Sequence, residues 1–224
     1  MTALFRTADG LLRGDAWATR SENPRRVVFG LLVVIVSFGM FYGAAMGTFG
    51  GLFGERTWQI LYSSLKVPLL LSATFAISLP SFFVLNTLLG LRDDFGEAVR
   101  ALMATQAGLA VILASLAPLT MFYYASTADY RTAVLFNGLM FAIASCAAQV
   151  LLRRHYRGLI TRHRNHRWLL WSWIAIYAFV GIQMGWLLRP FVGDPDMPVQ
   201  FFREGSWDNA YMIVIENVWH ALTD

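Results

Sequence analysis

Five long apolar stretches constrain the fold of this chain more than any other feature. They cover residues 27–50, 67–91, 99–125, 131–152 and 168–188. Each is long enough for an α-helix to cross about 30 Å of hydrocarbon, which takes about 20 residues. With 57% hydrophobic and 14% charged residues, the chain is too apolar for an ordinary soluble domain or a disordered protein. The sequence predicts an all-α fold, a polytopic membrane bundle of five transmembrane helices.

The basic residues fall mainly on one side of the predicted bundle. They lie in the first 26 residues, between the second and third spans, and in residues 153–167, whereas only Arg56, Lys66, Arg131, Arg189 and Arg203 fall on the other side. Because Lys and Arg accumulate on the cytoplasmic side, we expect a cytoplasmic N-terminus and an extracytoplasmic C-terminus. This orientation requires an odd number of spans, which agrees with five. We expect an integral protein of a bacterial inner membrane.

The segments outside the spans define the remaining predicted regions. Residues 1–26 mix apolar residues with arginines, which predicts a short interfacial amphipathic helix or a basic cytoplasmic tail. Residues 27–188 form the predicted transmembrane domain, and residues 189–224 an extracytoplasmic tail. In that tail Ser206 can cap an amphipathic helix with Trp207 and Tyr211 on its apolar face. Such a helix would serve as a lid, as a partner-binding element or as a plain membrane anchor.

Small residues and prolines are expected to shape how the spans pack. Gly39, Gly43 and Gly47 recur every four residues on the first span, so one helix face allows another backbone to approach closely. The partner is either another span of the same chain or a second copy of it. Pro80 and Pro118 lie inside the second and third spans, where each is expected to bend its helix.

Four side-chain amides lie inside the predicted spans. Asn86 and Gln106 fall at a similar depth near the cytoplasmic face, and Asn137 and Gln183 share a level near the outer face. Since a polar group in hydrocarbon needs a hydrogen-bond partner, we predict that the amides pair within each level. They would then either hold the helices together or line a polar path.

The region 153–167 is strongly basic and is predicted to contact anionic lipid headgroups. Its arginines are Arg153, Arg154, Arg157, Arg162, Arg164 and Arg167. Metal binding by His155, His163 and His166 is disfavoured because these histidines lie among cations without a Cys or carboxylate. Nucleic-acid binding is a weaker interpretation, and we expect none. The acidic segment 92–97 is expected to dock on this region.

Residue patterns for catalysis are missing from the chain. It has no intramembrane carboxylate pair, no Gly-rich phosphate loop and no His within the spans. The sequence therefore favours a non-enzymatic protein without cofactor or metal, acting as a structural or accessory subunit of a membrane assembly. The alternative is a channel or facilitator for a small solute or ion. The expected partners are the anionic bilayer and either other membrane proteins or further copies of the chain.

Three segments carry a family resemblance. Residues 66–71 (KVPLLL), 79–82 (LPSF) and 183–191 (QMGWLLRPF) resemble a family of uncharacterised bacterial multi-pass membrane proteins, and the resemblance extends over most of residues 60–205. It implies a multi-pass membrane fold and assigns no activity. The layout of five spans with an internal N-terminus is also similar to Yip1-type membrane proteins, in topology alone.

Overall fold

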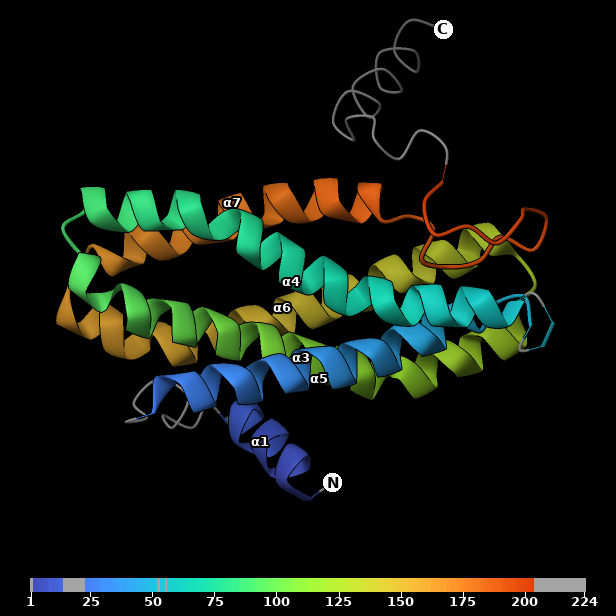
Figure 1. Ribbon diagram of the computed structural model, residues 1–224, viewed down its shortest axis with the longest axis horizontal. Coiled ribbons are helices and arrows are strands. Elements are labelled where there is room, and N and C mark those ends of the chain that lie inside the picture. Colours follow the sequence, from blue (N-terminus) through green and yellow to red (C-terminus); the bar gives the residue numbers. More distant parts are fainter. Residues whose placement is uncertain (1, 14–22, 52, 55, 204–224) are drawn as a thin grey trace, which may run out of the picture.

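The computed structural model describes residues 2–13, 23–51, 53–54 and 56–203. This part of the chain is all-α, and Figure 1 shows its long helices α3 to α7 running along one common axis while α1 crosses them at an angle. The helices are α1 (Thr2–Arg13), α3 (Pro24–Gly47), α4 (Arg56–Leu88), α5 (Phe95–Ser126), α6 (Tyr130–Arg162) and α7 (His166–Leu187), with a 3₁₀ turn η1 (Arg92–Asp94) before α5. Five of them, α3 to α7, are long and apolar enough to cross a membrane. The prediction of five helical spans is confirmed, which indicates an integral membrane protein.

Two helices extend well beyond the predicted spans. Helix α4 begins at Arg56 rather than at residue 67, and α6 continues to Arg162 rather than ending at residue 152. The basic region 153–167, which lies between the fourth and fifth predicted spans, is therefore mostly helix, and the turn between α6 and α7 covers residues 163–165. Helix α6 continues because Tyr156 and Leu159 are buried on one of its faces while the arginines point outward.

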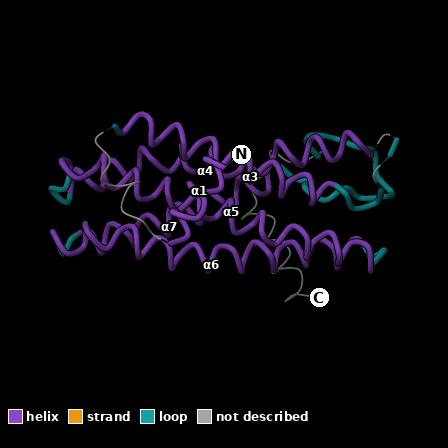
Figure 2. The backbone as a smooth tube through the Cα atoms, turned by 90° about the horizontal axis from the view of Figure 1, so that it is seen from below, coloured by secondary structure: helices purple, strands orange, loops and turns teal. Residues whose placement is uncertain are grey.

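The five long helices form an open arc rather than a closed ring. Their contacts follow the order α7, α4, α3, α5, α6, whereas α6 and α7 touch each other at few points. Helix α5 is the most buried of the five, and its buried face is rich in alanine, which lets α3 and α6 pack closely on either side. Figure 2 shows the connecting segments gathered at the two ends of the bundle.

We name these two ends by their residues. The basic end contains the start of α3, residues 89–94 between α4 and α5, and residues 163–165 between α6 and α7. The cap end contains the other two connections and the irregular segment 188–203, which we call the cap.

The glycine face of α3 packs against α4. A Cβ added at Gly43 would lie 2.3 Å from the carbonyl oxygen of Ser63, and one at Gly47 would lie 2.6 Å from the Cα of Ile60. A Cβ at Gly39 would meet Pro68 at 3.3 Å. These distances show close backbone approach within one chain. Because α4 occupies this face, self-association of two copies through it would require the α3–α4 contact to open.

Helix α1 lies against the flank of α3 and α5. Its Leu11 is fully buried, and the ring of Phe5 packs edge to face on Phe38 at 6.1 Å between centroids. The helix is thus present, but a position at the membrane surface remains a prediction. The predicted helix after Ser206 lies outside the described residues.

The two prolines that are predicted to bend their helices both lie inside continuous helices, Pro80 within α4 and Pro118 within α5. Pro68 also lies inside α4, because this helix begins at Arg56. Figure 1 shows α4 changing direction along its length, as expected where prolines remove backbone hydrogen bonds.

Candidate functional site

Helix α7 is held by α4, on the opposite side of the arc from α6. Its Trp173 packs edge to face on Phe75 and Phe82 of α4, at centroid distances of 5.3 and 5.0 Å. Helix α6 is instead held by α5, where Leu151 fills the space beside Gly108. Two helices that follow each other in sequence are therefore kept apart, and a cleft lies between them.

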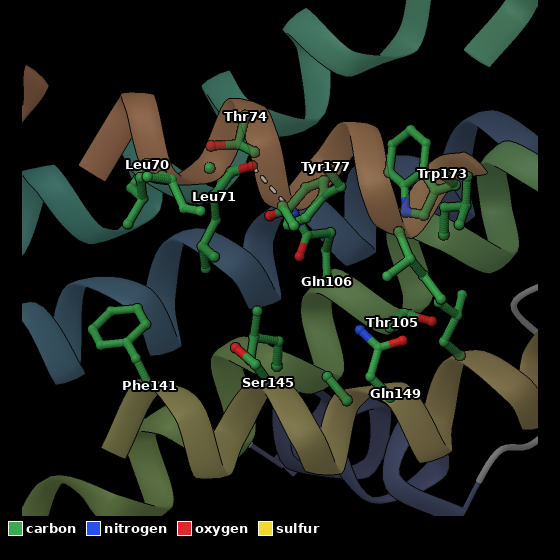
Figure 3. Close-up of a pocket in the computed structure, with 18 residues that line it drawn as sticks. Leu70, Leu71, Thr74, Thr105, Gln106, Phe141, Ser145, Gln149, Trp173 and Tyr177 are labelled. Carbon is green, nitrogen blue, oxygen red and sulfur yellow. Dashed lines mark hydrogen bonds between the residues drawn. The ribbon is translucent and has the colours of Figure 1, made fainter. Parts of the chain in front are cut away.

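The middle of this cleft is a cavity of about 320 Å³. Its walls come from α6 and α7, and its floor from α4 and α5, as Figure 3 shows. On the rims, Ser145 of α6 and Ile182 of α7 are both exposed. The lining is mostly apolar, with a few polar groups near the middle of the helices: Thr74, Thr105, Gln106, Ser145, Gln149 and Tyr177.

Gln106 organises the floor of the cavity. Its amide nitrogen donates hydrogen bonds to the carbonyl oxygen of Leu71, at 3.2 Å, and to the hydroxyl of Tyr177. One side chain of α5 therefore joins α4 to α7. Beside it, Thr74 is 1% exposed, and its hydroxyl has no hydrogen-bond partner among the residues that the structure describes. The cavity thus holds a buried hydroxyl that remains available.

The cavity continues toward the cap end as a wider groove of about 740 Å³, and the two share Leu70 and Phe141. The groove is lined by apolar side chains and by Arg131, Arg189 and Arg203 at its far end. Together the cavity and the groove form one apolar cleft with cationic groups at the cap end.

The cap that closes this end is attached to the first turns of α4. Arg56 donates to the carbonyl oxygen of Asp194 at 2.8 Å, and Ser63 donates to that of Phe191. Lys66 is fully buried, with its Nζ 2.6 Å from the carbonyl oxygen of Pro190 and 5.0 Å from the ring centroid of Phe201. Sequence reasoning placed Lys66 at a membrane border and missed this role, since its partner is 124 residues away.

Both predicted amide pairs are wrong. Asn86 does not bond Gln106, and both polar atoms of its buried side chain lack a partner within the described part of the chain. Asn137 does not bond Gln183. It accepts from the hydroxyl of Tyr42 at 3.3 Å and donates to Tyr124. The sequence predicts depth, but pairing also requires that two helix faces point at each other, and α3 separates most of α4 from α5.

At the basic end, side chains of α6 and α7 both contact the acidic segment that precedes and begins α5. Arg162 of α6 lies 2.6 Å from Asp94 and 3.1 Å from Glu97, and the fully buried His166 places Nε2 3.1 Å from Asp94. The expected docking of segment 92–97 on the basic region is confirmed. These contacts hold η1, α5, α6 and α7 together at this end.

The other basic side chains of this end face outward. Arg153, Arg154, Arg157, Arg164 and Arg167 are exposed, as is Arg162, and their contact with anionic lipid stays a prediction. Among the described residues, no group of three His, Cys, Asp or Glu side chains is arranged to hold a metal ion. The Nδ1 atom of His155 lies 3.5 Å from the hydroxyl oxygen of Thr105, and that of His166 lies 3.5 Å from the hydroxyl oxygen of Tyr156. The two buried histidines therefore contact different partners.

Comparison with protein-family models, with curated proteins and with solved structures finds no match for this chain. The family resemblance of residues 66–71, 79–82 and 183–191 therefore remains a prediction. What the protein does has to be inferred from the cleft itself.

Proposed function

We propose that the protein is a non-enzymatic structural or accessory subunit of a membrane assembly, and that it holds a lipid molecule between α6 and α7. The observation that carries this proposal is the cleft, whose two walls are kept apart by different neighbours and whose rims are exposed. In a bilayer the surroundings of such rims are lipid chains rather than water. A chain that enters the cleft gains dispersion contacts that an empty apolar cavity would lack.

The proposed setting is a bacterial inner membrane with the basic end in the cytoplasm. Most basic residues lie at that end, which supports this orientation by the positive-inside rule. The exposed arginines of α6 would contact anionic headgroups there, at about 1 kcal/mol for each residue near the surface. Arg162 contributes less, because Asp94 and Glu97 already bind it.

Filling the cleft tests the proposal. Ser145→Trp places a large ring on the α6 rim of the cavity, and we expect the purified protein to retain fewer lipid molecules, counted by native mass spectrometry after gentle detergent extraction. Ile143→Trp is the matched control, because Ile143 is exposed on α6 but does not line the cavity. Equal lipid retention by the two variants would contradict the proposal. Other proteins that travel with the intact chain would identify the assembly it serves.

A second candidate function is a channel or facilitator for a small solute or ion. The polar groups Gln106, Tyr177 and Thr74 at mid-depth favour it, because a solute crossing the bilayer needs hydrogen-bonding groups there. Flux measured in liposomes would support this function if Gln106→Leu abolished it in a folded protein. If liposomes that contain the protein show no flux above protein-free controls, the channel function is excluded and the lipid-binding function is the one that stands.

A further inference from the structure

We propose that the cavity between α6 and α7 binds a hydroquinone lipid, and that Gln106 and Tyr177 hold one hydroxyl group of its ring. By hydroquinone lipid we mean a dihydroxybenzene ring that carries a long apolar chain. The inference rests on the proposed lipid-binding function and adds the chemical class of the ligand.

The polar groups of the cavity lie near the middle of the membrane. Tyr177 is eleven residues after His166, where α7 begins, and ten residues before Leu187, where it ends. At 1.5 Å per residue it is therefore about 15 to 17 Å from either end, which is about half of a hydrocarbon core of about 30 Å. A phospholipid has only acyl chain at this depth and would leave these polar groups without partners. The ligand that suits them carries a polar group deep in the membrane.

Gln106 offers such a group a hydrogen-bond acceptor. Its side chain lines the cavity although the residue is 5% exposed. The two hydrogens of its amide nitrogen go to the carbonyl oxygen of Leu71 and to the hydroxyl of Tyr177. Because a backbone carbonyl can only accept, the bond to Leu71 fixes which end of the amide is the nitrogen. The side-chain oxygen then accepts from no residue in the described part of the chain, and it is available to a ligand.

Tyr177 offers a donor beside this acceptor. Its hydroxyl oxygen accepts from Gln106, so its own hydrogen is left for another acceptor, and none of the described residues takes it. One hydroxyl group of a ligand satisfies both side chains, because it donates to the oxygen of Gln106 and accepts from Tyr177. Thr74, whose buried hydroxyl also lacks a partner among the described residues, lines the same cavity.

The rest of the lining favours an uncharged aromatic ring. Among the described residues, no charged side chain and no histidine lines the cavity, so a charged ligand would be buried without a counter-charge. The rings of Trp173 and Tyr177 lie 5.6 Å apart on the α7 wall, and Phe141 lies on the α6 wall. Aromatic rings bind further rings through stacked and edge-to-face contacts. Figure 3 shows Ser145 and Gln149 pointing toward the cavity from α6, where the second hydroxyl of a hydroquinone would lie.

The size of the cleft suits a ring with an apolar chain. The cavity of about 320 Å³ is near the lower limit for small-molecule sites, which is about 300 Å³, so it accommodates a single ring. The wider groove of about 740 Å³ continues from it past Leu70 and Phe141, and most of its lining is apolar. The chain of the lipid would extend into this groove.

The experiment compares two probes that differ only in their two hydroxyl groups. Purified full-length protein in detergent micelles is mixed under nitrogen with equal amounts of decylhydroquinone and decylbenzene, and the bound molecules are counted by native mass spectrometry. We expect the wild-type protein to retain the hydroquinone in about tenfold excess, which corresponds to about 1.4 kcal/mol. Equal retention of the two probes would overturn the inference.

A substitution at Tyr177 ties this excess to the site. Tyr177→Phe keeps the ring but removes the donor, and it should lower the excess to about threefold, which is what one of two equal hydrogen bonds would leave. Tyr123→Phe is the matched control, because Tyr123 stacks on Phe136 and does not line the cavity. It should keep the wild-type excess. A Tyr177→Phe protein with the full excess would place the hydroquinone elsewhere and overturn the inference.

A third probe tests the acceptor without any substitution. The dimethyl ether of decylhydroquinone keeps both ring oxygens but has no O–H group, so it cannot donate to the side-chain oxygen of Gln106. We expect the wild-type protein to retain decylhydroquinone about threefold or more in excess over this ether. Because this comparison uses the wild-type protein, it does not depend on how a variant folds. Equal retention would remove Gln106 from the site and overturn the inference.

The outcomes also distinguish the two proposals. A cleft that retains phospholipid but shows no excess of hydroquinone over decylbenzene would overturn this inference and leave the lipid-binding function standing. Lipid retention that Ser145→Trp does not reduce would overturn the lipid-binding function itself.

Discussion

Asn86 is fully buried on α4, and neither polar atom of its side chain has a partner among the described residues. A buried polar group without a hydrogen bond costs about 1 to 3 kcal/mol. We therefore expect Asn86→Leu to raise the midpoint of thermal unfolding in detergent, or to leave it unchanged. Gln106→Leu is the contrast, because it removes the bonds to Leu71 and Tyr177 and should lower the midpoint. A drop in the midpoint for Asn86→Leu would mean that this amide has a partner after all.

Lys66 shows how one residue can hold a segment that is distant in sequence. Lys66→Met keeps an unbranched side chain that is one atom shorter, and it leaves the carbonyl oxygen of Pro190 without its donor. We expect faster cleavage within residues 189–203 in limited proteolysis, because the cap detaches more often. Leu65→Met, at the exposed neighbouring position, should cleave at the wild-type rate. Equal rates for both variants would show that Lys66 does not hold the cap.

The residues that were predicted correctly are those whose role depends on local spacing. The glycine face of α3 follows from its period of four, and the place of the four amides inside long helices follows from the apolar runs around them. Their partners depend on which helix faces which, and no local pattern contains that information. Thr74 and Tyr177 were missed for the same reason, since each matters only because Gln106 and the cavity lie beside it.

The close contact between α3 and α4 predicts that a methyl group added at Gly43 lowers the stability of the protein. Gly43→Ala would place a methyl group 2.3 Å from the carbonyl oxygen of Ser63, so the two backbones must separate. We expect a loss of about 1 to 3 kcal/mol in the free energy of unfolding, measured by denaturant titration in mixed micelles. Gly30→Ala is the control on the same helix, because a Cβ there meets nothing within 4 Å. Equal stability of the two variants would contradict the close packing.

Asp129 caps the start of α6, and its lowered pKa predicts that the stability of the protein depends on pH. Its carboxylate accepts the backbone N–H groups of Thr132 and Arg131, which holds its pKa below the ordinary value of 3.8. A lowered pKa in the folded protein stabilises it at neutral pH, and this contribution disappears as the pH falls through the lowered pKa. We expect Asp129→Asn to be less stable than the wild type at pH 7, with the difference shrinking below pH 4. A difference that stayed constant across this range would exclude the carboxylate as the cause.

The helices themselves were predictable because membrane spans have a fixed minimum length and continuous hydrophobicity. The residues at which α4 begins and α6 ends were not predictable from hydropathy. Helix α4 begins early because Gln59 and Ser63 bond the cap, and α6 continues because Arg162 reaches Asp94. In both places polar residues extend a helix through contacts made far away in sequence, which hydropathy cannot indicate.

The orientation of the whole molecule in the membrane can be tested directly. With Cys146 replaced by alanine, a single cysteine is introduced either by Arg164→Cys at the basic end or by Asp196→Cys in the cap. If the positive-inside rule holds, a membrane-impermeant maleimide should label the cap cysteine in intact cells, and the basic-end cysteine only after permeabilisation. The opposite pattern would reverse the orientation.

At this scale the sequence predicts a five-helix bundle but not its open arc. Helices joined by a short turn usually pack against each other, and residues 163–165 are such a turn. Here α7 instead packs on α4, through Trp173, Phe75 and Phe82. The cleft exists because α7 packs on α4 rather than on α6. It could therefore not be predicted without knowing which helices are neighbours in space.

The order of the arc also has a consequence for how the chain is assembled during synthesis. Among the described residues, α7 is the last helix to be synthesised, and it docks against α4, the second of the five long helices. Until then the aromatic face of α4 with Phe75 and Phe82 stays uncovered, and Lys66 has no cap to bind. A nascent chain that stops after residue 165 would thus lack both the helix that covers this aromatic face and the cap that Lys66 binds, so residues 166–203 complete the two contacts together.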